Sequence, residues 1–99
     1  LDMLPRIKEI IGVHPYIIKS MWTDGKIRDT VLNSLINKEG SVFNQLKNES
    51  LFLKAKLDRE ARTVYWENLL KMVDLDGKEI DVPLDVCPDV LLSLSKEVD

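Results

Sequence analysis

The chain has 99 residues, of which 44% are hydrophobic and 31% are charged, and its net charge is −3. A chain of this length buries roughly 60–70% of its unfolded surface, enough for one core, so we expect a single domain over residues 1–99. The composition excludes a disordered chain, and the longest apolar run, residues 10–13, excludes a membrane-spanning helix, which needs about 20 residues.

The single cysteine, Cys87, excludes an internal disulfide. With no export signal at its start, the protein is expected to be cytoplasmic. The charge is uneven, because residues 74–99 carry eight acidic and two basic residues whereas residues 1–73 carry nine acidic and twelve basic ones. The two parts either form two electrostatic faces or are ordinary solvated surface.

The first third of the chain reads as three strands. Residues Ile7–Val13 predict a strand that ends before Pro15, and a hairpin follows from Tyr16–Trp22 and Lys26–Leu32. Asp24-Gly25 between them is a strong signal for a two-residue turn. Such a turn sets Trp22 opposite Ile27, Ser20 opposite Asp29 and Ile18 opposite Val31. The core face is therefore expected to comprise Ile18, Trp22, Ile27 and Val31, with Arg28 and Thr30 on the other face.

The middle of the chain predicts short elements. A polar connection, Asn33–Ser41, precedes a short helix, Val42–Lys47, which Ser41 could cap. A helical turn is expected around Ser50–Phe52, followed by a half-buried strand, Leu53–Leu57.

The last part begins with a charged turn at Asp58–Arg62 and a strand at Thr63–Trp66. A second Asp-Gly, at residues 76–77, predicts another turn. A two-residue turn there would set Asp74 opposite Glu79, so a longer loop is the alternative.

Apolar residues alternate with polar ones from Ile80 to Val86, which predicts a strand, and Pro83 places it at an edge or a bulge. Pro88 suits the first turn of a final helix. The fold class is therefore α+β: one small domain, mainly an antiparallel sheet of four to six strands, with short helices on one side.

Five strings in this order carry a resemblance to a known family: Trp22–Arg28 (WTDGKIR), Phe43-x-x-Leu46, Phe52 with its strand, Thr63–Trp66 (TVYW) and Asp85–Leu91 (DVCPDVL). The chain resembles the bacterial family called domain of unknown function 2442 from about Pro5 to about Leu94. Members pass directly from the tryptophan to the Pro-Asp segment, whereas this chain adds an apolar hairpin-like stretch from Leu69 to Val82.

The resemblance implies a small α+β domain with a mainly antiparallel sheet. Some relatives carry a helix-turn-helix segment, and others are encoded beside a small partner protein as in toxin–antitoxin pairs. The residues after Leu91 are too few for a helix-turn-helix, so the resemblance favours a protein partner over DNA.

No pattern in the sequence predicts catalysis. His14 and Cys87 are single residues in distant segments and share no motif, and Asp74–Gly77 has only part of a calcium-loop pattern. We therefore predict no catalytic residue, no metal site and no cofactor, and a protein that is not an enzyme.

Two groups of charged residues are candidates for binding. Glu79, Asp81 and Asp85 are expected to line the outward face of the last strand, where they either dock a basic partner or keep an edge strand from aggregating. The second group, Lys54, Lys56, Arg59 and Arg62, could contact phosphates, although the interleaved Asp58 and Glu60 also fit a solvated turn.

The sequence thus predicts a non-catalytic, protein-binding accessory or antitoxin-like module whose partner is basic and encoded nearby. The alternative is a DNA-binding transcriptional regulator that uses the basic residues of the first part of the chain. No membrane association is expected, and the sequence does not define the oligomeric state.

Overall fold

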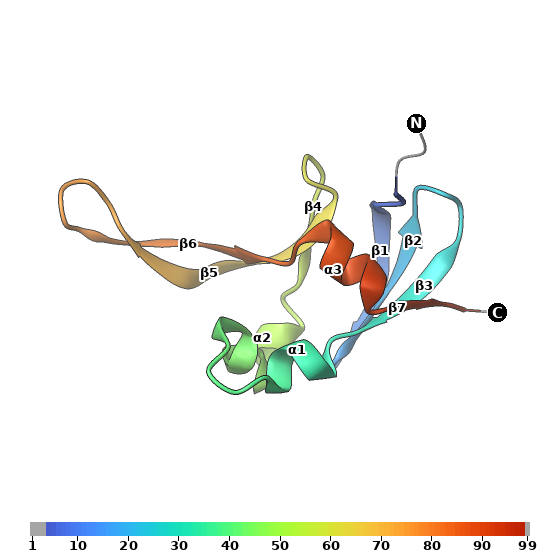
Figure 1. The fold of residues 1–99 in the computed structure, drawn as a ribbon, viewed down its shortest axis with the longest axis horizontal. Coiled ribbons are helices and arrows are strands. Elements are labelled where there is room, and N and C mark those ends of the chain that lie inside the picture. The colour runs from blue at the N-terminus through green and yellow to red at the C-terminus, as the bar shows by residue number, and fades with distance from the viewer. Residues whose placement is uncertain (1–3, 99) are drawn as a thin grey trace.

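The computed structural model describes residues 4–98 and contains two antiparallel sheets joined by short helices (Figure 1). The first sheet has the order β1-β2-β3-β7 and comprises β1 (Ile7–His14), β2 (Ile17–Trp22), β3 (Ile27–Val31) and β7 (Ser95–Glu97). The second has the order β4-β5-β6 and comprises β4 (Lys56–Asp58), β5 (Thr63–Val73) and β6 (Glu79–Asp85). The predicted α+β class is confirmed, with the strands divided between two sheets rather than gathered in one.

Four short helices complete the described chain: α1 (Asn33–Asn37), the 3₁₀ helix η1 (Val42–Lys47), α2 (Glu49–Phe52) and α3 (Pro88–Ser93). The Ser41 hydroxyl accepts the Phe43 N–H at 3.0 Å, which confirms the predicted cap of η1. By contrast, α1 lies in a segment predicted to be a polar connection, where it buries Ile36. None of the helices within residues 4–98 has the length and apolar character needed to cross a membrane.

The β2–β3 hairpin differs by one residue from the predicted register. The Gly25 N–H donates to the Trp22 carbonyl and the Trp22 N–H donates to the Lys26 carbonyl, both at 2.9 Å, so the loop has three residues, 23–25. Gly25 has a φ of 83°, the left-handed conformation that ends this type of loop. Met21 therefore pairs with Ile27, and the predicted pairing of Trp22 with Ile27 was wrong.

This shift exchanges the two faces of β3, because successive side chains of a strand alternate. Thr30 is buried on the core face, and the Arg28 guanidinium lies 5.3 Å from the ring centre of Trp22. Ile27 is only half-buried and Val31 is 38% exposed. The prediction that these two residues face the core was therefore wrong.

The strand predicted over Leu53–Leu57 begins only at Lys56. The end of α2 runs into a turn in which the N–H groups of residues 54 and 55 donate to the carbonyls of residues 51 and 52, at 3.0 and 3.1 Å. This turn leaves Leu53 51% exposed, so its predicted burial was wrong.

The hairpin formed by β5 and β6 projects far from the rest of the molecule (Figure 1). Its turn repeats the first one, since the Gly77 N–H donates to the Asp74 carbonyl at 3.0 Å and the Asp74 N–H donates to the Lys78 carbonyl at 2.9 Å. Val73 therefore pairs with Glu79, and the longer loop foreseen as the alternative is confirmed. It avoids a pair of like charges across the strands.

A bulge separates the projecting part of this hairpin, Leu69 to Val82, from the body, and we call that part the arm. Three residues of β5, 67–69, lie opposite Pro83 alone, and regular pairing resumes where Leu70 meets Val82. Asn68 adopts a φ of 57° within the bulge. Proline has no N–H for the ladder, and β6 is an edge strand, so Pro83 occupies a position that is both an edge and a bulge, as predicted.

The core joins the two sheets through aromatic residues. The Phe52 ring packs edge-on against Tyr16 at 5.2 Å and tilted against Trp66 at 5.8 Å. The Trp66 indole N–H donates to the Phe52 carbonyl at 3.0 Å, so its one polar group is satisfied although the side chain is buried. The buried apolar cluster comprises Ile7, Ile18, Trp22, Leu32, Ile36, Leu46, Phe52, Val64, Trp66, Val86 and Leu91.

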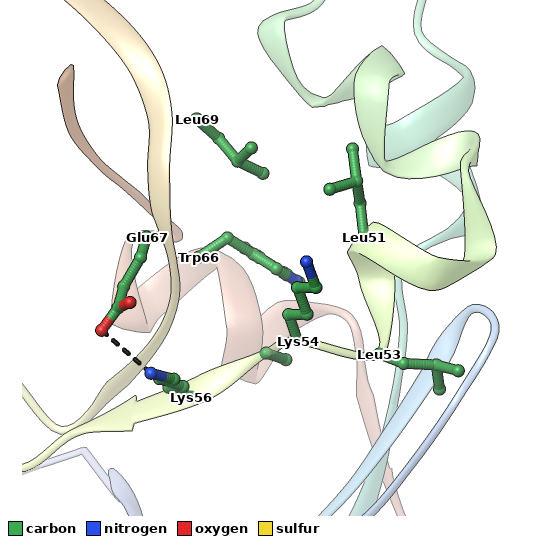
Figure 2. A pocket seen from close by; sticks show the side chains of 8 residues that line it. Leu51, Leu53, Lys54, Lys56, Trp66, Glu67 and Leu69 are labelled. Atoms are coloured by element: carbon green, nitrogen blue, oxygen red, sulfur yellow. Dashed lines mark hydrogen bonds and ion pairs between the residues drawn. The ribbon is translucent and has the colours of Figure 1, made fainter.

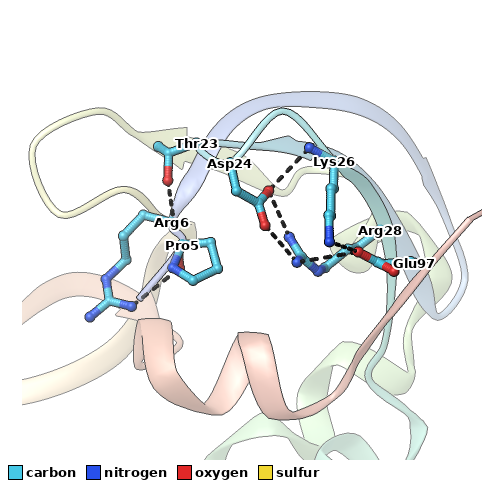
Figure 3. A network of polar contacts seen from close by, with 7 residues as sticks. All are labelled: Pro5, Arg6, Thr23, Asp24, Lys26, Arg28 and Glu97. Carbon is cyan, nitrogen blue, oxygen red and sulfur yellow. Dashed lines mark hydrogen bonds and ion pairs between the residues drawn. The ribbon is translucent and has the colours of Figure 1, made fainter. Parts of the chain in front are cut away.

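A polar network holds the first turn and the last strand together (Figure 3). The Arg28 guanidinium donates two hydrogen bonds to the Asp24 carboxylate, at 3.1 and 2.8 Å, and Lys26 forms an ion pair with Glu97 at 2.7 Å. The hydrogen bond from Arg28 lowers the pKa of Asp24 from 3.8 to about 2. The network thereby connects the β2–β3 turn with β7.

We expect Gly25→Ala to destabilise the protein by about 1–2 kcal/mol, because a Cβ is disfavoured at a positive φ. Gly12→Ala is the matched control, since Gly12 has no positive φ and a Cβ there lies no closer than 4.0 Å to a neighbour. Urea unfolding of both variants measures the difference. Equal effects of the two substitutions would contradict the role assigned to the loop.

The Asp24 ion pair predicts a defined dependence of stability on pH. Because the folded-state pKa, about 2, lies below the ordinary value of 3.8, the pair stabilises the fold fully above pH 3.8 and loses this effect as the pH falls towards 2. Asp24→Asn keeps the acceptor for the Lys26 N–H but removes the charge. In urea unfolding, the wild-type advantage over this variant should be constant above pH 3.8 and should shrink below it. An advantage that does not change with pH would rule out the pair as its source.

Candidate functional site

The arm has two chemically different faces. Residues paired across an antiparallel hairpin share a face, and successive pairs alternate between faces. One face carries four apolar residues, which we call the apolar stripe: Leu70, Met72, Ile80 and Val82. The other face, which we call the polar face, carries mainly charged residues: Lys71, Val73, Glu79 and Asp81.

Exposure increases along the apolar stripe from the body towards the tip. Trp66 and Leu84, which pair on the same face at the base of the arm, are buried in the core. Met72 and Ile80, near the tip, are 53% and 42% exposed, and Leu75 in the turn is completely exposed. The core face of the second sheet therefore continues outward as an uncovered apolar surface.

A pocket of about 410 Å³ lies where this surface meets the body (Figure 2). Its apolar lining comes from the end of α2, the turn after it and the base of the arm: Leu51, Leu53, Ala55, Trp66 and Leu69. Lys54 points into the pocket, whereas Lys56 at its edge forms an ion pair with Glu67 at 2.9 Å. The pocket thus combines apolar walls with one lysine that is directed inward.

The base of the arm is fixed to the helices by a side-chain hydrogen bond. Gln45 of η1 donates from Nε2 to the carbonyl of Leu69, in the bulge, at 2.8 Å. This bond satisfies a carbonyl that the bulge removes from the strand ladder. This hydrogen bond therefore ties the bulge, which also borders the pocket, to η1 at the base of the arm.

The three predicted partner-binding acids all lie on β6 and are exposed: Glu79, Asp81 and Asp85. Their odd numbering places them on one side of the strand, away from the apolar stripe. Asp85 lies on the body side of Pro83 and pairs with Tyr65, and we include it in the polar face. Lys71 forms an ion pair with Asp81, and this carboxylate raises the pKa of Lys71. Their use in binding stays a prediction.

The four predicted phosphate contacts lie at the two ends of β4. Lys54 and Lys56 line the pocket, and Lys56 is engaged by Glu67, which raises the pKa of Lys56. Arg59 and Arg62 lie in the exposed turn at the other end of β4. Their role in phosphate binding also stays a prediction.

His14 and Cys87 lie beside different elements of the fold. His14 ends β1 and Cys87 immediately precedes α3, and both are exposed. Within residues 4–98, no group of three or more His, Cys, Asp or Glu side chains is arranged to hold a metal ion.

Comparison of the chain with protein-family models, curated proteins and solved structures gives no match. The resemblance to the domain of unknown function 2442 family therefore stays a prediction.

The sequence patterns pointed to the acids of the arm but not to its apolar stripe. Alternation identified Ile80 and Val82 as one face of a strand, yet Leu70 and Met72 lie in a run, residues 69–73, that does not alternate cleanly. A three-residue loop at the second Asp-Gly would have set Met72 opposite Ile80. That loop length is the signal from which the stripe could have been found.

Proposed function

We propose that this protein is a non-catalytic protein-binding module, antitoxin-like or otherwise accessory to a partner encoded nearby, and that the polar face of the arm binds a basic segment of that partner. The observation that carries the proposal is the exposure of Glu79, Asp81 and Asp85 on one side of a projecting edge strand. The family resemblance supports a protein as the partner.

The charges of the polar face favour a basic ligand. Residues 79 and 81 are two positions apart on one strand, about 7 Å, so their carboxylates repel each other. Lys71 forms an ion pair with Asp81, and this exposed pair is of the kind that contributes little stability. A partner that brings two or three Lys or Arg side chains would relieve this repulsion and gain charge-assisted contacts.

The projecting position of the arm makes such a contact accessible. Among residues 4–98, β6 is paired with β5 alone, so its outer edge is available beside the acids. A basic segment can therefore approach the polar face and this edge together, and strand addition is one geometry for it. Pro83 limits the available edge to residues 79–82.

Removal of the three charges tests this proposal. We expect the triple variant Glu79→Gln, Asp81→Asn, Asp85→Asn to lose a basic protein that the wild type retains from an extract of its host at low salt. The loss follows because the variant removes the carboxylates while it preserves side-chain shape. Affinity capture followed by mass spectrometry, repeated at rising salt, measures it, and the wild-type complex should weaken as salt screens the charges.

The matched control changes net charge equally at exposed acids away from the arm: Glu9→Gln, Glu39→Gln, Glu60→Gln. It should retain the partner. Equal retention by both triple variants, or recovery of the wild type without a basic partner at every salt concentration, would reject the proposal.

A further inference from the structure

The apolar stripe has no cover in the described part of the chain, although it continues the core face. Met72, Ile80 and the turn residue Leu75 are all strongly exposed. A two-stranded hairpin is marginally stable by itself in water, and contiguous exposed apolar residues mark an interaction surface. The stripe lies on the opposite face from the acids used in the proposed function, so it requires a separate occupant.

We propose that this occupant is a second copy of the chain: two arms pack stripe against stripe about a two-fold axis, and each Leu75 enters the pocket at the base of the other arm. A two-fold axis places the same surface on both partners, so the surface must complement itself. The stripe meets this condition because it carries four apolar side chains and no charge.

The length of the arm places the tip of one copy at the pocket of the other copy. From Glu79 to Leu84 the strand makes five steps of about 3.4 Å, so the arm extends about 17 Å beyond its buried base. When two arms lie antiparallel in a two-fold arrangement, the tip of each reaches the base of the other. The base is where Trp66 and Leu69 line the pocket (Figure 2).

The pocket matches the tip in chemistry. Leu75 is completely exposed, whereas the pocket offers about 410 Å³ between Leu51, Trp66 and Leu69. A stable dimer buries roughly 800 Å² on each partner, which exceeds what four side chains of the stripe can present. Insertion of Leu75 adds the remaining contact and removes its side chain from water.

Charge complementarity favours this arrangement over other occupants. The turn of the arm carries Asp74 and Asp76; Asp74 accepts N–H bonds from residues 76 and 78 at 2.9 Å, whereas Asp76 is exposed. Lys54 points into the pocket that would receive this turn (Figure 2). Each acidic tip would thus meet a lysine of the other copy, consistent with the uneven charge of the two parts of the chain.

Sedimentation velocity over a range of protein concentrations tests the dimer. We expect Leu75→Asp to raise the dimer Kd at least about tenfold, because two buried leucines are lost at once. Leu75 is completely exposed in one copy, so the variant should fold, which circular dichroism verifies. Val90→Asp on α3, also an exposed apolar residue, is the matched control and should leave the Kd unchanged.

A charge exchange tests the pairing of tip and pocket. Lys54→Glu and Asp76→Lys should each weaken the dimer, and the double variant should restore it, because the exchanged charges again attract. A wild type that stays monomeric up to millimolar concentration would overturn the proposal. So would a dimer that is unaffected by Leu75→Asp, or a double variant that is weaker than either single one.

The test is independent of the basic partner. Removal of the acids on the polar face should leave the dimer intact, because they lie opposite the stripe. Loss of partner capture with an intact dimer supports both proposals. Failure to dimerise leaves the partner experiment unaffected.

Discussion

The contact between Trp66 and Phe52 is the interaction on which the rest of the structure depends. The Trp66 indole N–H donates to the Phe52 carbonyl, at the end of α2, at 3.0 Å. The centres of the two rings are 5.8 Å apart, and Tyr16 also packs edge-on against Phe52. A strand of the second sheet, a helix and the turn between β1 and β2 of the first sheet thus meet at one buried residue, Phe52. Because the indole group is both packed and hydrogen-bonded, it orients β5 where that strand leaves the core.

Beyond Trp66, the alternation of side chains along the β5–β6 hairpin gives the arm one apolar face and one charged face. The face that begins with Trp66 continues as the apolar stripe, and the opposite face gathers the acids of β6. The bulge opposite Pro83 lies at the boundary between body and arm, and Gln45 holds it in place. The hairpin therefore exposes a charged surface and an apolar surface on opposite faces.

The site could be predicted only in part. The acids Glu79, Asp81 and Asp85 share one strand, so their common face follows from a period of two and was visible in the sequence. The four cations were grouped by their closeness in the chain, and a turn together with a three-residue strand divides them into two places. The pocket is formed by residues 51–69, and no local pattern brings their side chains together.

The sequence by itself determined the two Asp-Gly turns and the approximate positions of β1, β2, β3 and β6, because Asp-Gly, proline and alternation act on neighbouring residues. It did not indicate β7 or the extension of β5 beyond Trp66. Only the tertiary structure decided the register, the division into two sheets and the projection of the arm. The register depended on whether each loop takes two residues or three, a choice that Asp-Gly alone leaves open and that exchanges buried and exposed faces, as Ile27 and Thr30 show. The two sheets meet where Phe52 packs against both Tyr16 and Trp66, and these contacts between separate segments do not follow from any local pattern.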